Sequence, residues 1–458
     1  MWIGWPPSPR LSEYVAKIEG ISNVLDSLIK RGFEGIVIGP WAAVENPKGR
    51  RRYGPFTSDA YRESLRRVIG DRCIKVDHYH PFNPTLRYYE ASPLKPRIVP
   101  KGIENVGERY FKEVVKAAYD RGLKIYYLWM LVCHTYGNPP NGAKEIMDVF
   151  NEGKEYVCPN TPGLPEYMEG YLRDILDNYP EVSGVILDHL EFPSYVAEEI
   201  FTCFCEGCRA KAEEYGYSFQ NLKLGALKLY AWIRGLSEEQ LRWYLESDLS
   251  PMDILAELFD NEGFIEWWQF RLRSIKELAK RIQEIVHEVD PSLELNVDSV
   301  APSFCNISGV SLASLSRYSD VLNPKLYPTE SYWGWRNRLA SYAGFISSGT
   351  DVKEGTAFKF LIKLFGLKAL SNYRNLDELK GKVFPTELFL DELEKAIRWY
   401  GNRGRIRPWV WLEYSSIREI KNMLQAIVKA GVEGAIFKQY SAATEEKLNL
   451  IQEELGVQ

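Results

Sequence analysis

Short apolar runs alternate with longer amphipathic segments along most of the chain. In each run almost every position is apolar, which is typical of a strand that is buried on both faces of a parallel sheet. Eight runs therefore predict strands, at residues 2–5, 33–41, 123–131, 183–190, 293–298, 320–328, 406–414 and 432–440.

The segments between the runs carry apolar residues at helical spacing, as at 14–32, 108–122, 164–180 and 417–431. Three of these four end in glycine, which favours the left-handed conformation that closes many helices. A strand followed by a helix, repeated eight times, predicts an α/β fold, the (β/α)8 TIM barrel.

Three long segments interrupt this alternation, at about residues 42–107, 203–262 and 329–386. They follow the second, fourth and sixth predicted strands, so they leave from the C-terminal face, where barrel enzymes build their sites. Long loops also decorate barrels without a role in binding. Since barrels with insertions can exceed 400 residues, we predict a single domain over residues 1–458.

Polar residues close several of the predicted strands. Burying such groups costs free energy unless they are paired or take part in function. The residues at these strand ends are Asp188, His189, Glu191, Asp298, Lys325, Tyr327, Trp411, Glu413 and Lys438. Each one alone could be structural, but several carboxylates on one rim predict an active site.

Two carboxyl groups beside aromatic rings are what glycoside hydrolysis requires. One protonates the leaving oxygen, and the other attacks the sugar or directs water. The candidate catalytic residues are Asp188, Glu413, Glu191 and Asp298, and aromatic residues form 13% of the chain. No nucleophile elbow, P-loop, HExxH or dinucleotide motif competes. The sequence therefore favours a glycoside hydrolase of carbohydrate metabolism, acting on an oligosaccharide or glycoside without a catalytic cofactor.

Further residues are candidates for substrate binding. His78 and His80 have the spacing to line one side of an extended segment, where they could bind hydroxyls or cap a loop. His134 follows the third predicted strand, which contains Trp129, and both residues are candidates to bind substrate. The same role is assigned to the strand-end residues His189, Lys325, Tyr327, Trp411 and Lys438.

Three cysteines stand close together in "CFCEGC", residues 203–208. Cys203, Cys205 and Cys208 offer three soft ligands, and zinc takes four, so Cys158 or a histidine would have to supply the last. This spacing predicts a structural zinc. The alternative is that the thiols are buried as small apolar residues.

The fourth predicted strand, "GVILDHLEFPS", resembles the LDYxRYP signature of the hypothetical glycosyl-hydrolase barrel families. In those families a CPNxP segment precedes the strand and a CxCxxC element follows it, as "VCPNTPGLPEY" (157–167) and "CFCEGC" do here. The resemblance implies a barrel glycosidase in which Asp188 occupies the position of the motif's aspartate. His189 and Glu191 replace the motif's tyrosine and arginine.

The seventh predicted strand, "WVWLEYS", resembles the nucleophile strand of the large retaining clan of glycosidase barrels. In that clan the acid/base follows strand four and the nucleophile, a glutamate, follows strand seven. The resemblance implies a retaining enzyme with Glu413 as nucleophile and Asp188 as acid/base. Glu191 is the substitute for Asp188, and Asp298 is the alternative second carboxylate.

Charge and hydropathy restrict the partners. The net charge is −5 and the basic residues are dispersed, so we expect no nucleic-acid partner. No apolar run is long enough to cross a membrane, and the N-terminus lacks the pattern of a signal peptide, so we expect a cytoplasmic protein. A homo-oligomer stays open. Two rival functions remain, a Schiff-base lyase using Lys325 and a non-catalytic carbohydrate-binding barrel.

Overall fold

The computed structural model describes residues 1–5, 15–39, 42–45, 51–53, 74–98, 106–130, 140–247, 252–253, 255–256, 262–329, 331, 334–432 and 434–456. Eight parallel strands close into a barrel in the order β1-β13-β12-β11-β10-β9-β6-β2. Their bounds are β1 Trp2–Gly4, β2 Gly35–Ile38, β6 Lys124–Met130, β9 Gly184–Asp188, β10 Glu294–Ser299, β11 Val321–Leu326, β12 Trp409–Trp411 and β13 Ile436–Lys438. All eight predicted strands and the predicted TIM barrel are confirmed.

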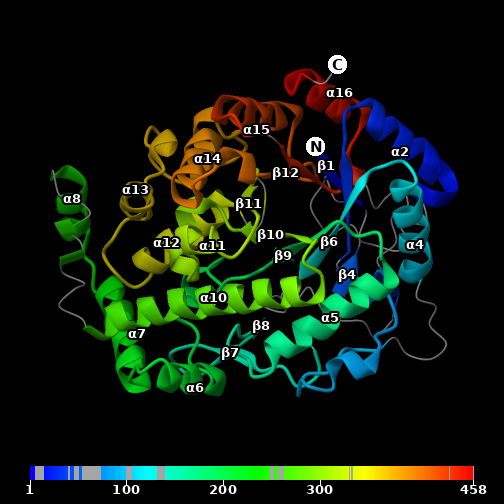
Figure 1. Cartoon of the computed structure of the whole chain (residues 1–458). Coiled ribbons are helices and arrows are strands. Elements are labelled where there is room, and N and C mark those ends of the chain that lie inside the picture. The colour runs from blue at the N-terminus through cyan, green and yellow to red at the C-terminus, as the bar shows by residue number, and fades with distance from the viewer. Residues whose placement is uncertain are drawn as a thin grey trace.

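Helices surround the barrel and connect its strands (Figure 1). They are α2 Ile21–Lys30, α4 Val106–Tyr119, α5 Leu164–Asn178, α10 Glu262–Val289, α11 Leu312–Leu315, α14 Thr386–Tyr400, α15 Ile417–Ala430 and α16 Glu445–Glu454. The four predicted helices are confirmed with shifted ends, and the first is divided at Gly20 into η1 Val15–Glu19 and α2. Gly32, Gly122 and Gly431 follow three of them at φ of 78°, 75° and 66°, the left-handed conformation that the sequence predicted there.

The three long segments contain further elements. The first holds an antiparallel sheet of β3 Ala42–Glu45, β5 Ile74–Tyr79 and β4 Arg51–Tyr53, and then η2 Leu86–Tyr89. The second holds α6 Glu206–Glu214, α7 Phe219–Arg234 and α8 Glu238–Glu246, and η3 Ala197–Phe201 lies just before it. The third holds α12 Trp335–Ser347, α13 Glu354–Leu364, η6 Lys368–Leu370 and η7 Asp377–Leu379. The single-domain organisation stays a prediction.

One excursion was missed by the sequence analysis. Between β6 and α5 the chain forms an antiparallel pair, β7 Glu145–Met147 and β8 Gly153–Val157. These strands are short and polar, so they do not produce an apolar run. The remaining short helices are η1 Val15–Glu19, η4 Pro302–Phe304, η5 Asn306–Ser308, η8 Arg403–Arg405 and η9 Tyr440–Ala442.

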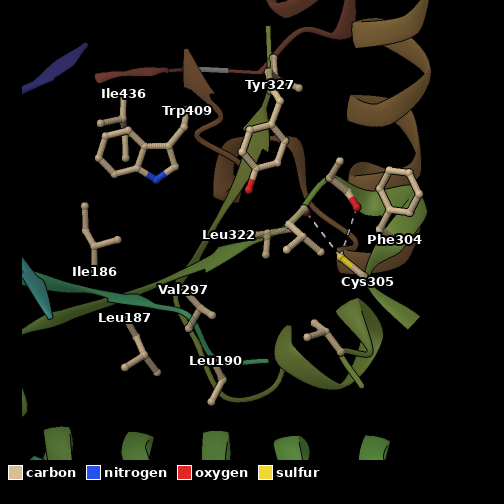
Figure 2. Packing of buried hydrophobic residues seen from close by; sticks show 14 of the residues in the cluster. Ile186, Leu187, Leu190, Val297, Phe304, Cys305, Leu322, Tyr327, Trp409 and Ile436 are labelled. Carbon is tan, nitrogen blue, oxygen red and sulfur yellow. Dashed lines mark hydrogen bonds between the residues drawn. The ribbon is translucent and has the colours of Figure 1, made fainter. Parts of the chain in front are cut away.

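The strands separate an inner core from the layer under the helices. Ile186 and Leu187 lie on opposite sides of β9, and Ile186 shares the inner side with Trp409 and Ile436 (Figure 2). At the N-terminal end of the barrel, the guanidinium of Arg407 lies 3.9 Å from the ring centroid of Trp2 and pairs with Glu294. This end is closed by packing, so any site that the barrel carries lies at the opposite end, here called the barrel mouth. No helix in the described part of the chain is long and apolar enough to span a membrane.

Candidate active site

Three neighbouring strands bring Asp188, Asp298 and Lys325 together at the barrel mouth. Val297 of β10 pairs with Leu187 of β9, so the residues that follow them, Asp298 and Asp188, stand at the same height on adjacent strands. Lys325 reaches them from β11, with its Nζ 2.5 Å from Asp188 Oδ1 and 3.7 Å from Asp298 Oδ2. We call these three residues the paired half of the mouth.

The paired half holds fixed charges. Burial opposes ionisation of Asp188, but the charges of His189 and Lys325 outweigh it and hold the pKa of Asp188 below its usual range. Burial also disfavours the ammonium of Lys325, yet the charge of Asp188 raises the pKa of Lys325 well above its usual value. Asp188 and Lys325 are therefore an ion pair at neutral pH.

Asp298 differs from Asp188 in protonation. Burial, and then the charge of Asp188, raise the pKa of Asp298 well above its usual value. Its Oδ1 accepts hydrogen bonds from Trp409 Nε1 at 2.7 Å and from Asn323 Nδ2 at 3.3 Å. Because two carboxyl groups share one ammonium here, Asp188 carries the negative charge and Asp298 stays protonated near neutral pH.

His189 joins Glu191 to this network. Its Nδ1 lies 3.1 Å from Glu191 Oε1, and its Nε2 lies 3.5 Å from Asp188 Oδ2. The hydroxyl of Tyr195 donates to Glu191 Oε1 at 2.7 Å. Burial opposes ionisation of Glu191, but the hydrogen bond and charge of His189 lower its pKa. Glu191 Oε2 is buried and has no hydrogen-bond partner among the described residues.

Glu413 and Lys438 form the other side, which we call the unpaired half. Glu413 lies two residues beyond β12, and its buried Oε1 has no hydrogen-bond partner in the described part of the chain. Burial raises the pKa of Glu413 to about 7, against the charges of Lys438 and Lys447. Glu413 is therefore poised to exchange a proton near neutral pH.

Lys438 ends β13, with its Nζ 3.4 Å from the ring centroid of Trp411. Burial lowers its pKa, and the charge of Glu413 opposes that shift. The remaining influences on its pKa come from Lys325, Asp188 and Asp298, so Lys438 lies within electrostatic reach of both halves. Among the described residues no carboxylate forms an ion pair with it.

In each half, the residue directly after a charged strand-end residue has a left-handed backbone conformation. His189, directly after Asp188, has φ of 62°, and Gln439, directly after Lys438, has φ of 69°. For residues other than glycine such a conformation costs roughly 1–3 kcal/mol, and it recurs at active sites and ligand clamps. The strain is an independent sign that these two strand ends are functional.

The aromatic candidates lie in different environments. The ring centroid of Tyr327 lies 5.5 Å from that of Trp411 and 6.3 Å from that of Trp335. Trp411 is only 4% exposed, so it is less open than the sequence prediction of a sugar platform assumes. Trp129 pairs with Leu187 and shares the outer face of β6 with Tyr127, whose hydroxyl lies 3.2 Å from that of Tyr171 on α5. Trp129 therefore faces the helices and not the barrel mouth.

No described contact brings the histidines of the first long segment, or the one after the third predicted strand, to this cluster. His80 is buried, with its Nε2 3.1 Å from the hydroxyl of Tyr167 on α5, and its ring stacks on Phe82. Burial lowers the pKa of His80 to about 4, so it is neutral. His78 pairs with Ala43 in the small sheet, but its side chain is not among those described. His134 lies outside the described residues.

Trp409, Asn323 and Tyr195 also belong to the site, although the sequence did not predict them. Trp409 and Asn323 stand two residues before Trp411 and Lys325, so the two-residue period of a strand could have placed them on the same inner face. Tyr195 follows the strand in a loop, and no pattern in the sequence signals its bond to Glu191.

The predicted cysteine cluster forms. The sulfur atoms of Cys158, Cys203, Cys205 and Cys208 are buried and all lie within 4.8 Å of one another. A zinc ion with four sulfurs at about 2.3 Å needs sulfur separations of about 3.8 Å, so the cluster is close to that geometry. Four soft ligands in this arrangement could bind a metal.

Backbone and side-chain amides point at these sulfurs. The Asn160 amide nitrogen lies 3.4 Å from Cys158 Sγ, and its Nδ2 lies 3.3 Å from Cys208 Sγ. The amide nitrogen of Met147 lies 3.4 Å from Cys203 Sγ. Such donors stabilise thiolates and are usual around metal-bound cysteines.

Comparison with known proteins identifies the fold and no closer relationship. No protein-family model matches the chain, and no curated protein matches its sequence at a significant level. A β-galactosidase from the psychrophilic Marinomonas ef1 aligns with 99% of this chain and 58% of its own length, at 10% identity and a TM-score of 0.51. This likeness shows the fold alone, a TIM barrel.

Two further solved structures align less well. The β-galactosidase of the Antarctic haloarchaeon Halorubrum lacusprofundi aligns with 99% of this chain and 57% of its own length, at 11% identity and a TM-score of 0.45. A chitinase from Chromobacterium violaceum ATCC 12472 aligns over 100% and 99%, at 8% identity and a TM-score of 0.44. The chain spans less than two thirds of the length of both galactosidases.

Proposed function

We propose that the protein is a glycoside hydrolase that acts on an oligosaccharide or glycoside through two carboxyl groups. One observation carries this proposal. Asp188 and Glu413, at the ends of two strands of one barrel, have pKa values displaced in opposite directions, Asp188 downward and Glu413 upward to about 7. Two carboxyl groups held in different protonation states are what an acid and an anionic partner require.

The resemblance to the retaining clan implies Glu413 as nucleophile and Asp188 as acid/base. The directions of their pKa shifts support the reverse assignment. With a pKa of about 7, Glu413 carries its proton in a substantial fraction of the protein at neutral pH, so it is the proposed general acid, which protonates the leaving oxygen. Asp188 is ionised and is the proposed anionic partner, which bonds to the anomeric carbon or directs a water molecule to it. The first route retains the anomeric configuration, as the sequence predicts, and the second inverts it.

The other two carboxyl groups take supporting roles in this proposal. Glu191 is ionised and has one oxygen without a partner among the described residues, so it is the alternative anionic partner. Asp298 is protonated and accepts hydrogen bonds from Trp409 and Asn323, so we assign it to positioning Lys325. Lys438 and Trp411 are proposed to contact the substrate from the unpaired half.

The rival functions fit this arrangement less well. A Schiff-base lyase needs a neutral amine, but the ion pair with Asp188 keeps Lys325 charged. A non-catalytic sugar-binding barrel needs no proton donor near pH 7. Both rivals predict no hydrolysis of glycosides.

The test is a panel of aryl glycosides with the wild type, Asp188→Asn and Glu413→Gln. Hydrolysis of at least one glycoside, lost in both variants, would support the proposal, and the anomer released first reports retention or inversion. Full activity in Asp188→Asn would remove the residue on which the proposal rests. Binding of sugars without turnover in the wild type would favour the binding module instead.

We also propose that the four-cysteine cluster holds a structural zinc. The site is closed by four sulfur ligands, which is typical of structural rather than catalytic zinc. Cys203, Cys205 and Cys208 follow the β9 segment, and Cys158 follows β8, so the ion would tie two excursions of the chain together. We expect about one zinc per chain, and a lower melting temperature with little change in chemistry for Cys205→Ser. Metal analysis that finds no zinc in carefully purified protein would end this proposal.

A further inference from the structure

A buried cation without an anion lies in α10. The side chain of Arg271 is only 2% exposed, and its Nε and Nη2 have no hydrogen-bond partner among the described residues. Its guanidinium carbon lies 5.1 Å from the ring centroids of both Phe192 and Trp267. Aromatic rings attract a cation, but they do not replace an anion or hydrogen bonds. A guanidinium that is buried against rings alone therefore lowers the folding stability.

A second buried arginine has hydrogen-bond partners for part of its guanidinium group. Arg338 of α12 also stacks on rings, those of Tyr195 and Phe304. Its Nη1, however, donates to the carbonyl and the hydroxyl of Ser194, at 3.3 and 3.0 Å. The comparison indicates that Arg271 is completed by something that the described part of the chain does not supply.

The cysteine cluster is connected to α10 through Ser274, three residues after Arg271. Ser274, one helical turn further along α10, lies with its Oγ 3.1 Å from Asn160 Nδ2, and that same Nδ2 reaches Cys208 Sγ. Burial lowers the pKa of Arg271 to about 9, and the groups that oppose this shift are Tyr342, Cys203 and Cys208. This face of α10 is therefore within electrostatic reach of the sulfurs.

We propose that Arg271 is the counter-charge of a metal-loaded tetrathiolate, so that metal binding supplies the anion that this buried guanidinium lacks. Four thiolates and one divalent ion carry a net charge of −2, which one arginine reduces to −1. The inference rests on the proposed zinc site and extends it to a residue that binds no metal itself. Arg271 is thus a positioning residue for the charge of the cluster.

The same contact connects the metal to the barrel mouth. Phe192, on which Arg271 stacks, directly follows Glu191, and its amide nitrogen donates to the carbonyl of Ser308 at 2.9 Å. Charge at the cluster therefore holds Arg271 against the segment that carries Glu191. Loss of metal would leave this segment next to an unbalanced cation.

The test compares Arg271→Met and Arg271→Lys with the wild type, with and without zinc. Zinc affinity is measured at fixed pH by competition with a chromophoric chelator, and stability by thermal unfolding of the zinc-loaded and zinc-stripped proteins. We expect Arg271→Met to weaken zinc binding by about 10- to 100-fold, as outer-shell changes at metal sites do. Without zinc, the same variant should melt no lower than the wild type, because it removes an unpaired charge. Arg271→Lys keeps the charge and should bind zinc within a few-fold of the wild type.

Arg338→Met is the matched control. It should lower the melting temperature with and without zinc alike and leave zinc affinity unchanged, since Arg338 is already hydrogen-bonded. Equal zinc affinity in the wild type and Arg271→Met would overturn the role of Arg271 while leaving the zinc site standing. No zinc binding by the wild type would instead overturn the site itself. If Arg271→Met does not fold, Arg271→Gln replaces it with the same expectations.

Discussion

The two halves of the barrel mouth contain the same residue types in opposite electrostatic states. In the paired half, Lys325 lies within 4 Å of two carboxylates, the pKa of Asp188 is lowered and that of Lys325 is raised. In the unpaired half, Glu413 and Lys438 make no ion pair among the described residues, and both pKa shifts are reversed. Burial is similar on both sides, so Asp188 and Glu413 differ because the ammonium of Lys325 pairs with Asp188, whereas Asp298, the second carboxyl group beside that ammonium, has a raised pKa like Glu413.

Strand register explains the difference. Lys325 stands between two carboxylates because its neighbour on the sheet, β10, brings Asp298 level with Asp188 of β9. Glu413 lies beyond the end of β12, where no described strand offers it a partner. The paired half therefore supplies a permanent anion, and the unpaired half supplies a group that can release and regain a proton near neutral pH.

The largest expected effect separates the roles of the two halves. Asp188→Asn should lower kcat by several orders of magnitude for every substrate, because the anionic partner is lost. Glu413→Gln should lose about 10²- to 10⁴-fold on ordinary glycosides, the usual contribution of a general acid. It should recover much of this loss on dinitrophenyl glycosides, whose leaving group needs little protonation. Kinetics across leaving groups of graded pKa checks both expectations.

The opposite pattern would restore the roles implied by the clan resemblance. If Asp188→Asn is rescued by good leaving groups and Glu413→Gln is not, Glu413 is the nucleophile and Asp188 the acid/base. The two halves would then still differ in charge, but their pKa values in the free protein would not report their roles.

The next effect concerns the stability of the paired half. Burial is the main cause of the raised pKa of Asp298, and the charge of Asp188 is the second. When Asp188 becomes Asn, this second cause is lost, so Asp298 ionises more readily and can pair with Lys325. The double variant Asp188→Asn/Asp298→Asn leaves Lys325 without a carboxylate and should cost about 3–5 kcal/mol of unfolding free energy, more than either single change. Adding Lys325→Met should recover most of that loss. Urea unfolding at pH 7 measures the unfolding free energy of the wild type, the two single variants, the double variant and the triple variant.

An equal loss in the single and double variants would show that Asp298 does not take over the charge. Failure of Lys325→Met to restore stability would mean that the loss comes from packing and not from an unpaired ammonium.

The barrel and the rim could be predicted because both leave local patterns. A strand buried on two faces gives a continuous apolar run, and a polar residue that closes such a run stands out, as Asp188 and Lys325 do. Cys158 was a candidate fourth ligand because its thiol matches the other three, and it lies with them. These features need only the neighbouring residues of the sequence.

The remaining features depend on register and on distant contacts. Trp129 was predicted to bind substrate because it lies near a strand end. Its neighbour Met130 pairs with Asp188, and because adjacent residues of a strand face opposite sides, Trp129 faces the helices. His80 is fixed by Tyr167, 87 residues away. Arg271 lies in the middle of an amphipathic helix, where the sequence gives no sign that its charge is buried. A sequence pattern gives the period of a strand or helix but not the partner that each face meets.

A third effect is a pH-dependent gain in stability. The pKa of Glu413 is raised from 4.5 to about 7, so between these values the unfolded chain releases this proton while the folded protein retains it. The stability associated with this group is fully present below about pH 4.5 and is lost as pH rises through about 7. Glu413→Gln escapes this loss, which amounts to about 3 kcal/mol. Compared with the wild type, the variant should therefore gain stability between pH 4.5 and 8, measured by urea unfolding at each pH.

Asp188→Asn is the informative contrast for that experiment. The pKa of Asp188 is lowered, so its contribution to stability is present above the unfolded value of 3.8 and is lost as pH falls through the folded value. The difference between Asp298→Asn and Asp188→Asn/Asp298→Asn, a pair in which residue 298 cannot titrate, should therefore stay constant from pH 5 to 8. A constant difference for Glu413→Gln as well would mean that Glu413 is ionised throughout this range.

The smallest expected effect tests whether Lys438 tunes the acid. After burial, the charge of Lys438 is the largest influence on Glu413, and it lowers the pKa of that carboxyl. Lys438→Met removes the charge, so the pKa of Glu413 should rise further above 7, and the stability loss should extend to higher pH. The measurement is the difference in unfolding free energy between Lys438→Met and Lys438→Met/Glu413→Gln, plotted as a curve from pH 5 to 9. This curve is compared with the one for the wild type and Glu413→Gln. Lys447→Met is the matched control and should move the curve less, because Lys447 is the weaker influence and donates to the carbonyl of Leu412. If the curve does not move in Lys438→Met, Glu413 owes its pKa to burial alone, and the unpaired half consists of two independent residues.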